Sequence, residues 1–341
     1  MLRILHNTSW DFIKEWKKAA IALVIFILPA LVLIPISGYS YSIEFTGGTM
    51  MQIRFDEPQE TADVRAALEA AGHGDAEIAT FGGPADFMIR AQEPEAIAQQ
   101  EAGAASVAFE IERALTEAFG EGSFEEVQRE AVSARVGSEL RQKASIAMLI
   151  AFGLTLVYLA WRFESRFAVA AVLATVHDLI ATLAFMKYMD IEISLFVVGS
   201  ILTVIGYSMN DKVVVFDRVR ENLKKGKKVP LYDLLNQSVN ETLPRTVMTG
   251  STTLACLLAL LIFGGDVIRP FAWVLTFGIV IGTFSSIYVA SPLLLWIERK
   301  YPRLSADKAH VSASQARAES QVEAEAPPRP MRGAKAPAGR R

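Results

Sequence analysis

The sequence predicts an integral membrane protein: an all-α bundle of six transmembrane helices with a small α+β domain after the first helix. Hydrophobic residues make up 52% of the 341 residues and the mean hydropathy is +0.29, which is too apolar for an ordinary soluble enzyme. Six apolar segments are long enough to cross a hydrocarbon layer, which needs about 20 helical residues. Between the first two of them, about a hundred residues follow a strand and helix pattern instead.

The apolar segments are separated by short connections or by charged ones. We expect transmembrane helices at residues 19–36, 144–161, 167–189, 193–216, 247–263 and 271–297. The first segment is longer than the core of a usual signal peptide and lacks an Ala-x-Ala cleavage site, so we interpret it as a retained anchor. An even number of spans places both ends of the chain on one side of the membrane.

The distribution of lysine and arginine predicts the orientation. The leader at residues 1–18 and the loop at residues 217–246 are basic, whereas residues 38–140 contain no lysine and many acidic residues. By the positive-inside rule, both termini and the basic loop are expected in the cytoplasm. Residues 37–141 then form an extracytoplasmic, periplasmic domain. Residues 303–341 lack apolar periodicity and are rich in Ala, Ser, Glu, Pro and Arg, which predicts a disordered cytoplasmic tail.

The periplasmic domain has a regular order of expected elements. Strands are expected at residues 49–55, 76–82, 86–92 and 124–132, and amphipathic helices at residues 61–72 and 101–120. The order β-α-β-β-α-β is that of a ferredoxin-like domain. This domain contains no nucleotide fingerprint, metal-ligand cluster or nucleophile and base pair, and the chain has a single cysteine, Cys256. We therefore expect the domain to bind or brace another molecule rather than to catalyse a reaction.

The fourth expected span carries an amide and a carboxylate, Asn210 and Asp211, inside its apolar run. An ionised aspartate in lipid costs at least about 2.5 kcal/mol, and such residues usually face a bundle interior and mark ion or proton pathways. Asp217 lies seven residues after Asn210 and so shares its helical face. The structural alternative is that Asp211 pairs with a cation and holds helices together. We expect Lys212 to point away from Asp211 and extend to the cytoplasmic interface.

Arg245 is the better partner for Asp211, because it stands just before the fifth expected span and can reach back into the bundle. His177 and Asp178 are adjacent in the third span, where either a hydrogen-bonded helix contact or an auxiliary proton relay is expected. Gly199 and Gly206 in the fourth span would permit close helix packing.

The small residues Thr46, Gly47 and Gly48 join the first span to the periplasmic domain. They would form either a hinge or a simple turn.

Three stretches together resemble a known family. They are GYSMNDKVVVFDRVREN at residues 206–222, NETLPRTVMTGSTT at residues 240–253 and IEFTGGTMMQIRF at residues 43–55. They are similar to the SecF branch of the SecD/SecF family of protein translocase subunits, which is related to the proton-driven resistance-nodulation-division transporters. The resemblance extends from Trp10 to about Arg303 and does not cover the tail.

The resemblance implies a function that composition cannot give. It implies a non-enzymatic membrane component that uses the proton motive force, together with SecD, to promote export of unfolded preproteins across the bacterial inner membrane. The implied partners are SecD, the SecYEG channel, YajC and membrane lipids, with no nucleic acid and with protons in place of a cofactor. The residues implicated in the family's proton path map onto Asp211 and Arg245. The alternatives are a proton-coupled exporter of a small molecule or lipid on the same transmembrane plan, and a scaffold whose buried charges only hold helices together.

Overall fold

The computed structural model describes residues 8–80, 83–91, 103–225 and 229–301. The expected tail at residues 303–341 lies outside the described residues. The chain divides into two units, Met1–Leu293 and Leu294–Arg341. The first unit contains all the helices up to the π turn described below and the whole sheet.

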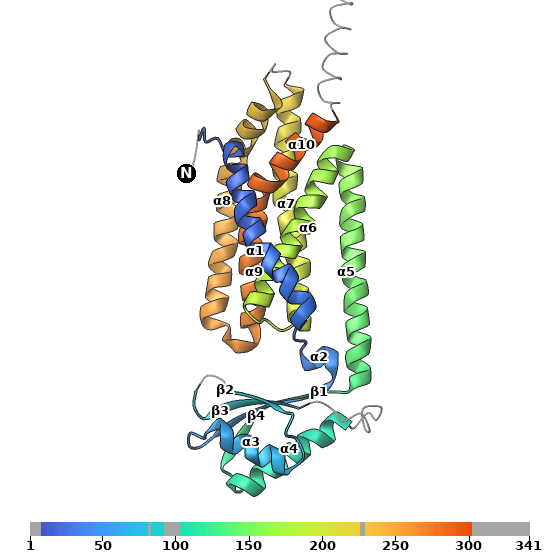
Figure 1. The fold of residues 1–341 in the computed structure, drawn as a ribbon. Helices are drawn as coiled ribbons and strands as arrows, with labels where there is room; N and C mark the ends of the chain where they lie inside the picture. Colours follow the sequence, from blue (N-terminus) through green and yellow to red (C-terminus); the bar gives the residue numbers. More distant parts are fainter. Residues whose placement is uncertain (1–7, 81–82, 92–102, 226–228, 302–341) are drawn as a thin grey trace, which may run out of the picture. The chain divides into compact units, whose positions relative to one another are not determined.

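Long helices form the bundle of the first unit (Figure 1). They are α1 (Trp16–Ser37), α5 (Ala134–Arg162), α6 (Ser165–Tyr188), α7 (Leu195–Lys224), α8 (Leu231–Phe263) and α9 (Gly265–Ser285). A short 3-10 turn, η1 (Ile13–Glu15), precedes α1, and a π turn, η2 (Ser286–Ala290), follows α9 and leads into α10 (Ser291–Lys300). Much of the expected basic loop at residues 217–246 is helical, since α7 extends to Lys224 and α8 begins at Leu231.

Among the described residues, five helical stretches are long and apolar enough to cross a membrane. They are Ile13–Ser37, Ala134–Arg162, Ser165–Tyr188, Leu231–Phe263 and Val267–Lys300. The 30-residue helix α7 does not meet this criterion, because Asn210, Asp211 and Lys212 interrupt its apolar run and its last two turns are charged. Length and composition therefore support five of the six expected spans.

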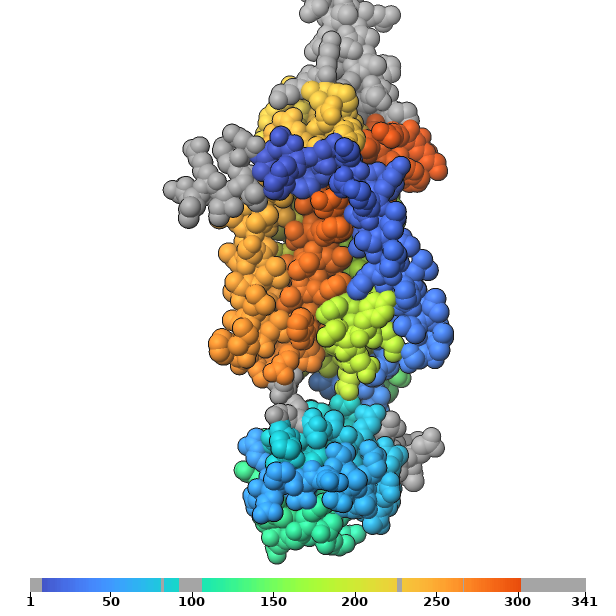
Figure 2. Space-filling view, turned by 60° about the vertical axis from the view of Figure 1, so that its left-hand side comes forward, coloured from blue at the N-terminus to red at the C-terminus, as the bar shows by residue number. Residues whose placement is uncertain are grey.

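The helix that fails this criterion is packed among the others. Helix α7 contacts α6, α8 and α9, and its apolar residues Val197, Ile201 and Ile205 are buried with Met186 of α6 and Val274 of α9. By contrast, α1 lies on the surface of the bundle, as Figure 2 shows in blue. Many large apolar side chains of α1, α5 and α8 are exposed, as is expected of side chains that face lipid tails.

Glycines of α9, rather than those of α7, allow close helix packing. A methyl group added at Gly199 or Gly206 would meet no atom within 4 Å, so the expectation for these two glycines is wrong. A methyl group at Gly282 would lie 2.9 Å from the Ser208 Cβ, and one at Gly278 would overlap the side chain of Val204. The four-residue spacing of these two glycines puts them on one face of α9 and lets its backbone approach α7.

The domain between α1 and α5, which we call the head, has its elements in the predicted order. They are β1 (Gly48–Phe55), α3 (Thr61–Ala70), β2 (Glu77–Thr80), β3 (Asp86–Ala91), α4 (Gly103–Phe119) and β4 (Phe124–Val132). The strands form one antiparallel sheet in the order β2-β3-β1-β4. Figure 1 shows α3 and α4 on one side of it.

The pleat of the sheet divides the side chains of β1 and β3 into two sets. One set is buried against the helices: Met51, Ile53, Phe55, Phe87, Ile89 and Ala91 pack with Val64, Leu68, Val107, Ile111 and Leu115. The other set, which includes Gln52 and Arg90, lies on the sheet face that the helices leave uncovered.

The junction between α1 and the head is closely packed. A single helical turn, α2 (Ile43–Thr46), ends at Gly47, which has a φ of 81°. A methyl group at Gly47 would lie 2.5 Å from the Cα of Ala134, the first residue of α5. One at Gly137 would lie 3.1 Å from the carbonyl carbon of Phe45. Both the positive φ and the close approach of two backbones require glycine at residue 47.

We expect the substitution Gly47→Ala to lower the free energy of unfolding by about 1–3 kcal/mol, because it adds steric overlap to a strained φ. Gly72→Ala is the matched control, since Gly72 also has a positive φ, of 87°, but has no atom within 4 Å of an added methyl group. Thermal unfolding of both variants in detergent measures the difference. Equal melting temperatures would show that the contact with Ala134 contributes nothing.

Candidate functional site

Among the described residues of helices α1 to α9, two carboxylates are buried inside the bundle, Asp178 on α6 and Asp211 on α7. Asp178 is 1% exposed and Asp211 is 8% exposed. Because a lipid-embedded bundle offers no bulk water, each carboxylate needs hydrogen-bond donors from neighbouring helices. The two carboxylates obtain them in different ways.

Asp178 is neutralised by a lysine. Its Oδ2 accepts a hydrogen bond from Lys212 Nζ at 2.6 Å and one from Ser285 Oγ at 2.7 Å, and it also contacts Ser208 Oγ. Its Oδ1 lies 3.0 Å from Nδ1 of His177. A cation, two hydroxyls and an imidazole thus surround this carboxylate, which is the saturation that a buried charge requires.

The expectation that Lys212 extends to the membrane interface is wrong. Its side chain is fully buried, and Nζ also contacts the hydroxyl and the carbonyl of Ser208, one turn earlier on α7. Adjacent helical residues point about 100° apart. Lys212 therefore points away from Asp211 and toward Asp178 on α6. Its ammonium group forms an ion pair with Asp178 instead of extending to the membrane interface.

Asp211 is held by hydroxyl groups. Thr246 Oγ1 of α8 donates to Oδ1 at 2.7 Å, and Ser286 Oγ donates to Oδ2 at 2.5 Å. No described cation forms an ion pair with it. A hydroxyl can rotate to donate to a carboxylate or to accept from a carboxylic acid. The hydrogen-bond donors to Asp211 are therefore neutral hydroxyl groups, whereas Asp178 has an ammonium group among its donors.

Two consecutive serines connect the carboxylates. Ser285 is the last residue of α9 and contacts Asp178, while Ser286 is the first residue of the π turn and contacts Asp211. The close packing of α9 on α7 at Gly282 brings this serine pair to the carboxylates. Single π turns inside helices occur frequently at functional sites. We call Asp178, Asp211, Lys212 and their hydroxyl donors Ser208, Thr246, Ser285 and Ser286 the core polar network.

The other residues predicted at this site lie outside the network. Arg245 is exposed on α8, and its neighbour Thr246, rather than Arg245 itself, contacts Asp211. Asn210 is exposed and lines a small hollow with Leu154 and Tyr158 of α5. Asp217 pairs with Arg162 Nη2 at 2.7 Å near the last turns of α7. Asn210 and Asp217 thus lie on a face of α7 that does not contact Asp211 or its partners.

His177 is at the edge of the network. Its Nδ1 contacts Asp178, and its buried Nε2 has no hydrogen-bond partner among the described residues. Within the described part of the chain, no group of three His, Cys, Asp or Glu side chains could hold a metal ion.

The sequence contained weak signals for the residues that were missed. Ser208 and Lys212 are four residues apart, so they share a helical face. Ser285 and Ser286 are consecutive hydroxyl residues in a mostly apolar run, and two glycines, Gly278 and Gly282, precede them at four-residue spacing. None of these signals identifies a partner, because the contacts join helices that are far apart in sequence.

The fold and this network define a multi-pass membrane protein with an ionisable site inside its helix bundle and a small sheet domain outside it. A family model described as protein export membrane protein SecD/SecF, C-terminal, matches residues 111–300, and a second, for the SecD/SecF GG motif, matches residues 32–59. The chain therefore belongs to the SecD/SecF family of protein export membrane proteins. This membership gives it a non-catalytic role in the Sec protein translocation machinery.

Similar proteins and structures agree with this family. A protein translocase subunit SecF from Gemmatimonas aurantiaca is 54% identical over 306 residues, covering 89% of this chain and 92% of the relative. The subunit of the same name from Escherichia coli O157:H7 is 36% identical over 299 residues, covering 87% and 89%. The crystal structure of SecDF from Thermus thermophilus, described as a translocon-associated membrane protein, matches with a TM-score of 0.76 and 33% identity. That match covers 88% of this chain and 40% of the SecDF chain.

We expect Lys212→Met to lower the free energy of unfolding by about 3–5 kcal/mol, because it leaves Asp178 buried without its cation. The double variant Asp178→Asn/Lys212→Met removes both charges and should recover most of the loss, since the asparagine still accepts from Ser285. Lys225→Met is the control: Lys225 forms a surface ion pair with Glu221, so its loss should cost at most about 1 kcal/mol. Thermal unfolding in detergent gives all three values, and a Lys212→Met variant as stable as Lys225→Met would contradict the assigned ion pair.

Proposed function

We propose that the chain promotes export of unfolded preproteins across the bacterial inner membrane, acting with SecD and drawing on the proton motive force. The observation that carries the coupling to protons is the contrast between the two buried carboxylates. Asp178 has Lys212 as a counter-ion, whereas Asp211 has hydroxyl partners and forms no ion pair with a described cation. Asp211 is therefore the group that can change its protonation state at the lower electrostatic cost.

In this proposal Asp211 is the residue that is loaded with a proton, and Arg245 is its cationic partner along the path. Arg245 immediately precedes Thr246, which donates to Asp211, so a rotation of α8 by about 100° would exchange a hydroxyl donor for a guanidinium. His177 and Asp178 remain an auxiliary relay or a helix contact. Protons are the coupling ion, and no other cofactor is required.

The finer topology belongs to the same proposal. We take α7 as the sixth span, because it is 30 residues long and packs against three helices that are apolar enough to cross the membrane. The head is then a periplasmic ferredoxin-like domain, and both termini are cytoplasmic, as the basic leader and basic loop favour. Membrane lipids cover the exposed apolar side chains of the outer helices.

The proposed partners follow from the family resemblance, and the SecDF structure supports SecD among them. The chain spans 40% of the SecDF chain, so a SecD protein is expected to supply the other half, as a separate chain or as a fused one. A path at the interface between two pseudo-symmetric halves needs both of them. SecYEG is the channel with which this pair would associate, YajC is an accessory partner, and nucleic acid has no role.

We expect Asp211→Asn to assemble normally but to abolish the gradient-dependent part of secretion in reconstituted vesicles, because an amide cannot exchange a proton. Arg245→Ala should impair the same part. Asp56→Asn, which removes an exposed carboxylate after β1, is the control and should behave as the wild type. Secretion is measured with and without a proton gradient, and unchanged gradient dependence in an assembled Asp211→Asn variant would exclude the proton path.

Copurification provides an independent test of the assigned machinery. SecD and SecYEG subunits should be recovered with the tagged chain, and Asp211→Asn should not reduce the yield. A deletion strain that secretes normally but fails to export a small molecule or lipid would instead support a proton-coupled exporter.

A further inference from the structure

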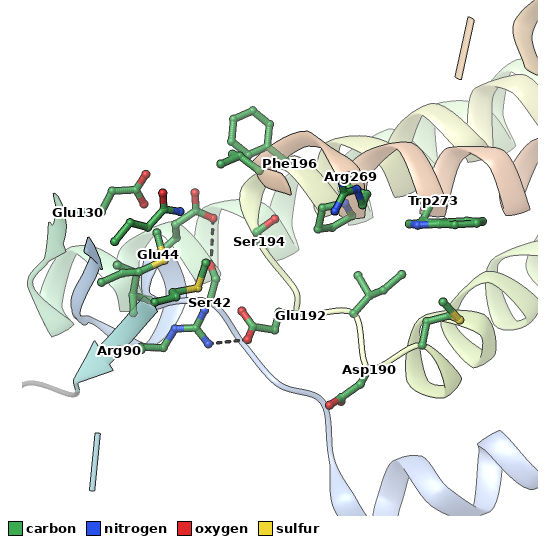
Figure 3. A pocket seen from close by; sticks show the side chains of 18 residues that line it. Ser42, Glu44, Arg90, Glu130, Asp190, Glu192, Ser194, Phe196, Arg269 and Trp273 are labelled. Atoms are coloured by element: carbon green, nitrogen blue, oxygen red, sulfur yellow. Dashed lines mark hydrogen bonds and ion pairs between the residues drawn. The ribbon is translucent and has the colours of Figure 1, made fainter. Parts of the chain in front are cut away.

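A second site is present where the head meets the bundle. A cavity of about 490 Å³ lies between the uncovered face of the sheet and the first turns of α7 and α9 (Figure 3). Strands β1 and β3 contribute Met50, Gln52, Met88 and Arg90. Residues of α7, of α9 and of the loop after α6 complete the wall. We call this space the sheet-face cavity.

The cavity is held together by polar contacts between head and bundle. Arg90 Nη1 donates to Glu192 Oε1 at 2.5 Å, as Figure 3 shows. Glu44 of α2 accepts from the backbone N–H of Leu195 at 2.6 Å. The backbone of Ser42 also donates to the carbonyl of Ile193, at 3.0 Å. These contacts join the head to the segment that begins α7, so the cavity has walls from both parts.

Two donors in the cavity wall lack partners. Gln52 is 7% exposed, and among the described residues neither its Nε2 nor the Nε of Arg90 has a hydrogen-bond partner, although both are buried. An unpaired buried donor is costly, so such groups in a native structure require an explanation. The register of β1 against β4 shifts between Gln52 and Ile53, and bulges of this kind are common where a strand aims a side chain at a binding site. The two donors fit a ligand that brings hydrogen-bond acceptors.

The remaining lining determines which acceptor fits. Acidic groups outnumber basic ones, because Glu44, Glu130, Asp190 and Glu192 face Arg90 and Arg269. This excess of negative charge disfavours a phosphate headgroup or another anionic ligand. A neutral carbonyl acceptor carries no such penalty.

The apolar side chains of the lining can adapt to ligands of different shapes. Met50, Met88 and Met189 lie along the cavity, together with Phe196 and Trp273. Methionine side chains are flexible and polarizable, and they recur on surfaces that accept many different partners. Such a lining suits a ligand whose apolar side chains vary in shape.

We propose that the sheet-face cavity binds a short extended segment of the exported polypeptide. Backbone carbonyls of the segment accept from Gln52 and Arg90, its apolar side chains pack on the methionines, and its basic side chains lie near the glutamates. This inference rests on the proposed role in protein export and adds to it the surface that contacts the substrate. The preferred segment is apolar and basic, and acidic segments are rejected.

The test uses a photocross-linking amino acid placed at residue 88 of the full-length chain in phospholipid nanodiscs that contain phosphatidylglycerol. The probes are a synthetic peptide of alternating leucine and lysine and a matched one of alternating leucine and glutamate. A cross-linker at Phe109, which is 65% exposed on α4 on the other side of the sheet, is the position control. We expect adducts of the lysine peptide at residue 88, several-fold fewer with the glutamate peptide, and none above background at residue 109.

Gln52→Met separates binding from folding. Removal of one hydrogen-bond donor to a carbonyl should reduce the cross-linking yield about five- to tenfold at subsaturating peptide. The melting temperature should stay the same or rise, because a buried unpaired amide is replaced by an apolar group of similar shape. An unchanged yield in this variant, equal yields at residues 88 and 109, or lipid adducts at residue 88 that the peptide does not displace would each overturn the proposal.

The result can be separated from that of the proton path. If Asp211→Asn loses gradient dependence but no peptide adduct forms at residue 88, only the proposed peptide-binding role of the cavity is excluded. If specific peptide adducts form but gradient dependence is unchanged in Asp211→Asn, the proposed proton path is excluded. The cavity is then retained as a substrate contact.

Discussion

A charge inside a helix bundle must be compensated by other groups of the bundle, and the ion pair between Asp178 and Lys212 meets this requirement at the centre of the molecule. It joins α6 to α7, and Ser285 adds the end of α9 to the same carboxylate. Since separation of these helices would expose two unpaired charges to lipid, the pair restricts how far they can move apart. Asp211 lies beside this pair, accepts hydrogen bonds from hydroxyl groups and forms no ion pair of its own among the described residues.

The backbone of α9 makes this arrangement possible. Gly278 and Gly282 let α9 approach α7 so closely that added methyl groups would overlap Val204 or Ser208. The last residue of α9, Ser285, and the first residue of the π turn, Ser286, contact two different carboxylates. A change at either carboxylate therefore alters the contact of one of two adjacent residues, Ser285 or Ser286.

Contacts of two kinds join the head to the bundle. At Gly47 the backbone packs directly against the first residue of α5, which fixes the point where the sheet begins. At Arg90 and Glu44 the contacts are polar and reach the loop and first turn that start α7. Helix α7 thus carries the core polar network in its middle and touches the head at its beginning. A displacement of α7 would therefore alter the walls of the sheet-face cavity.

Local sequence determined the elements of this protein. Five of the six expected spans, the strand and helix order of the head and the buried position of Asp211 follow from apolar periodicity and from the cost of charge in lipid. The partners of the buried groups required the tertiary structure, because the contacts of Asp178 and Asp211 cross between helices separated by 30 to 107 residues. The positions of Lys212 and Asp211 along α7 predict that their side chains point in different directions. The burial of the Lys212 ammonium group in an ion pair depends on the packing of α6 beside α7.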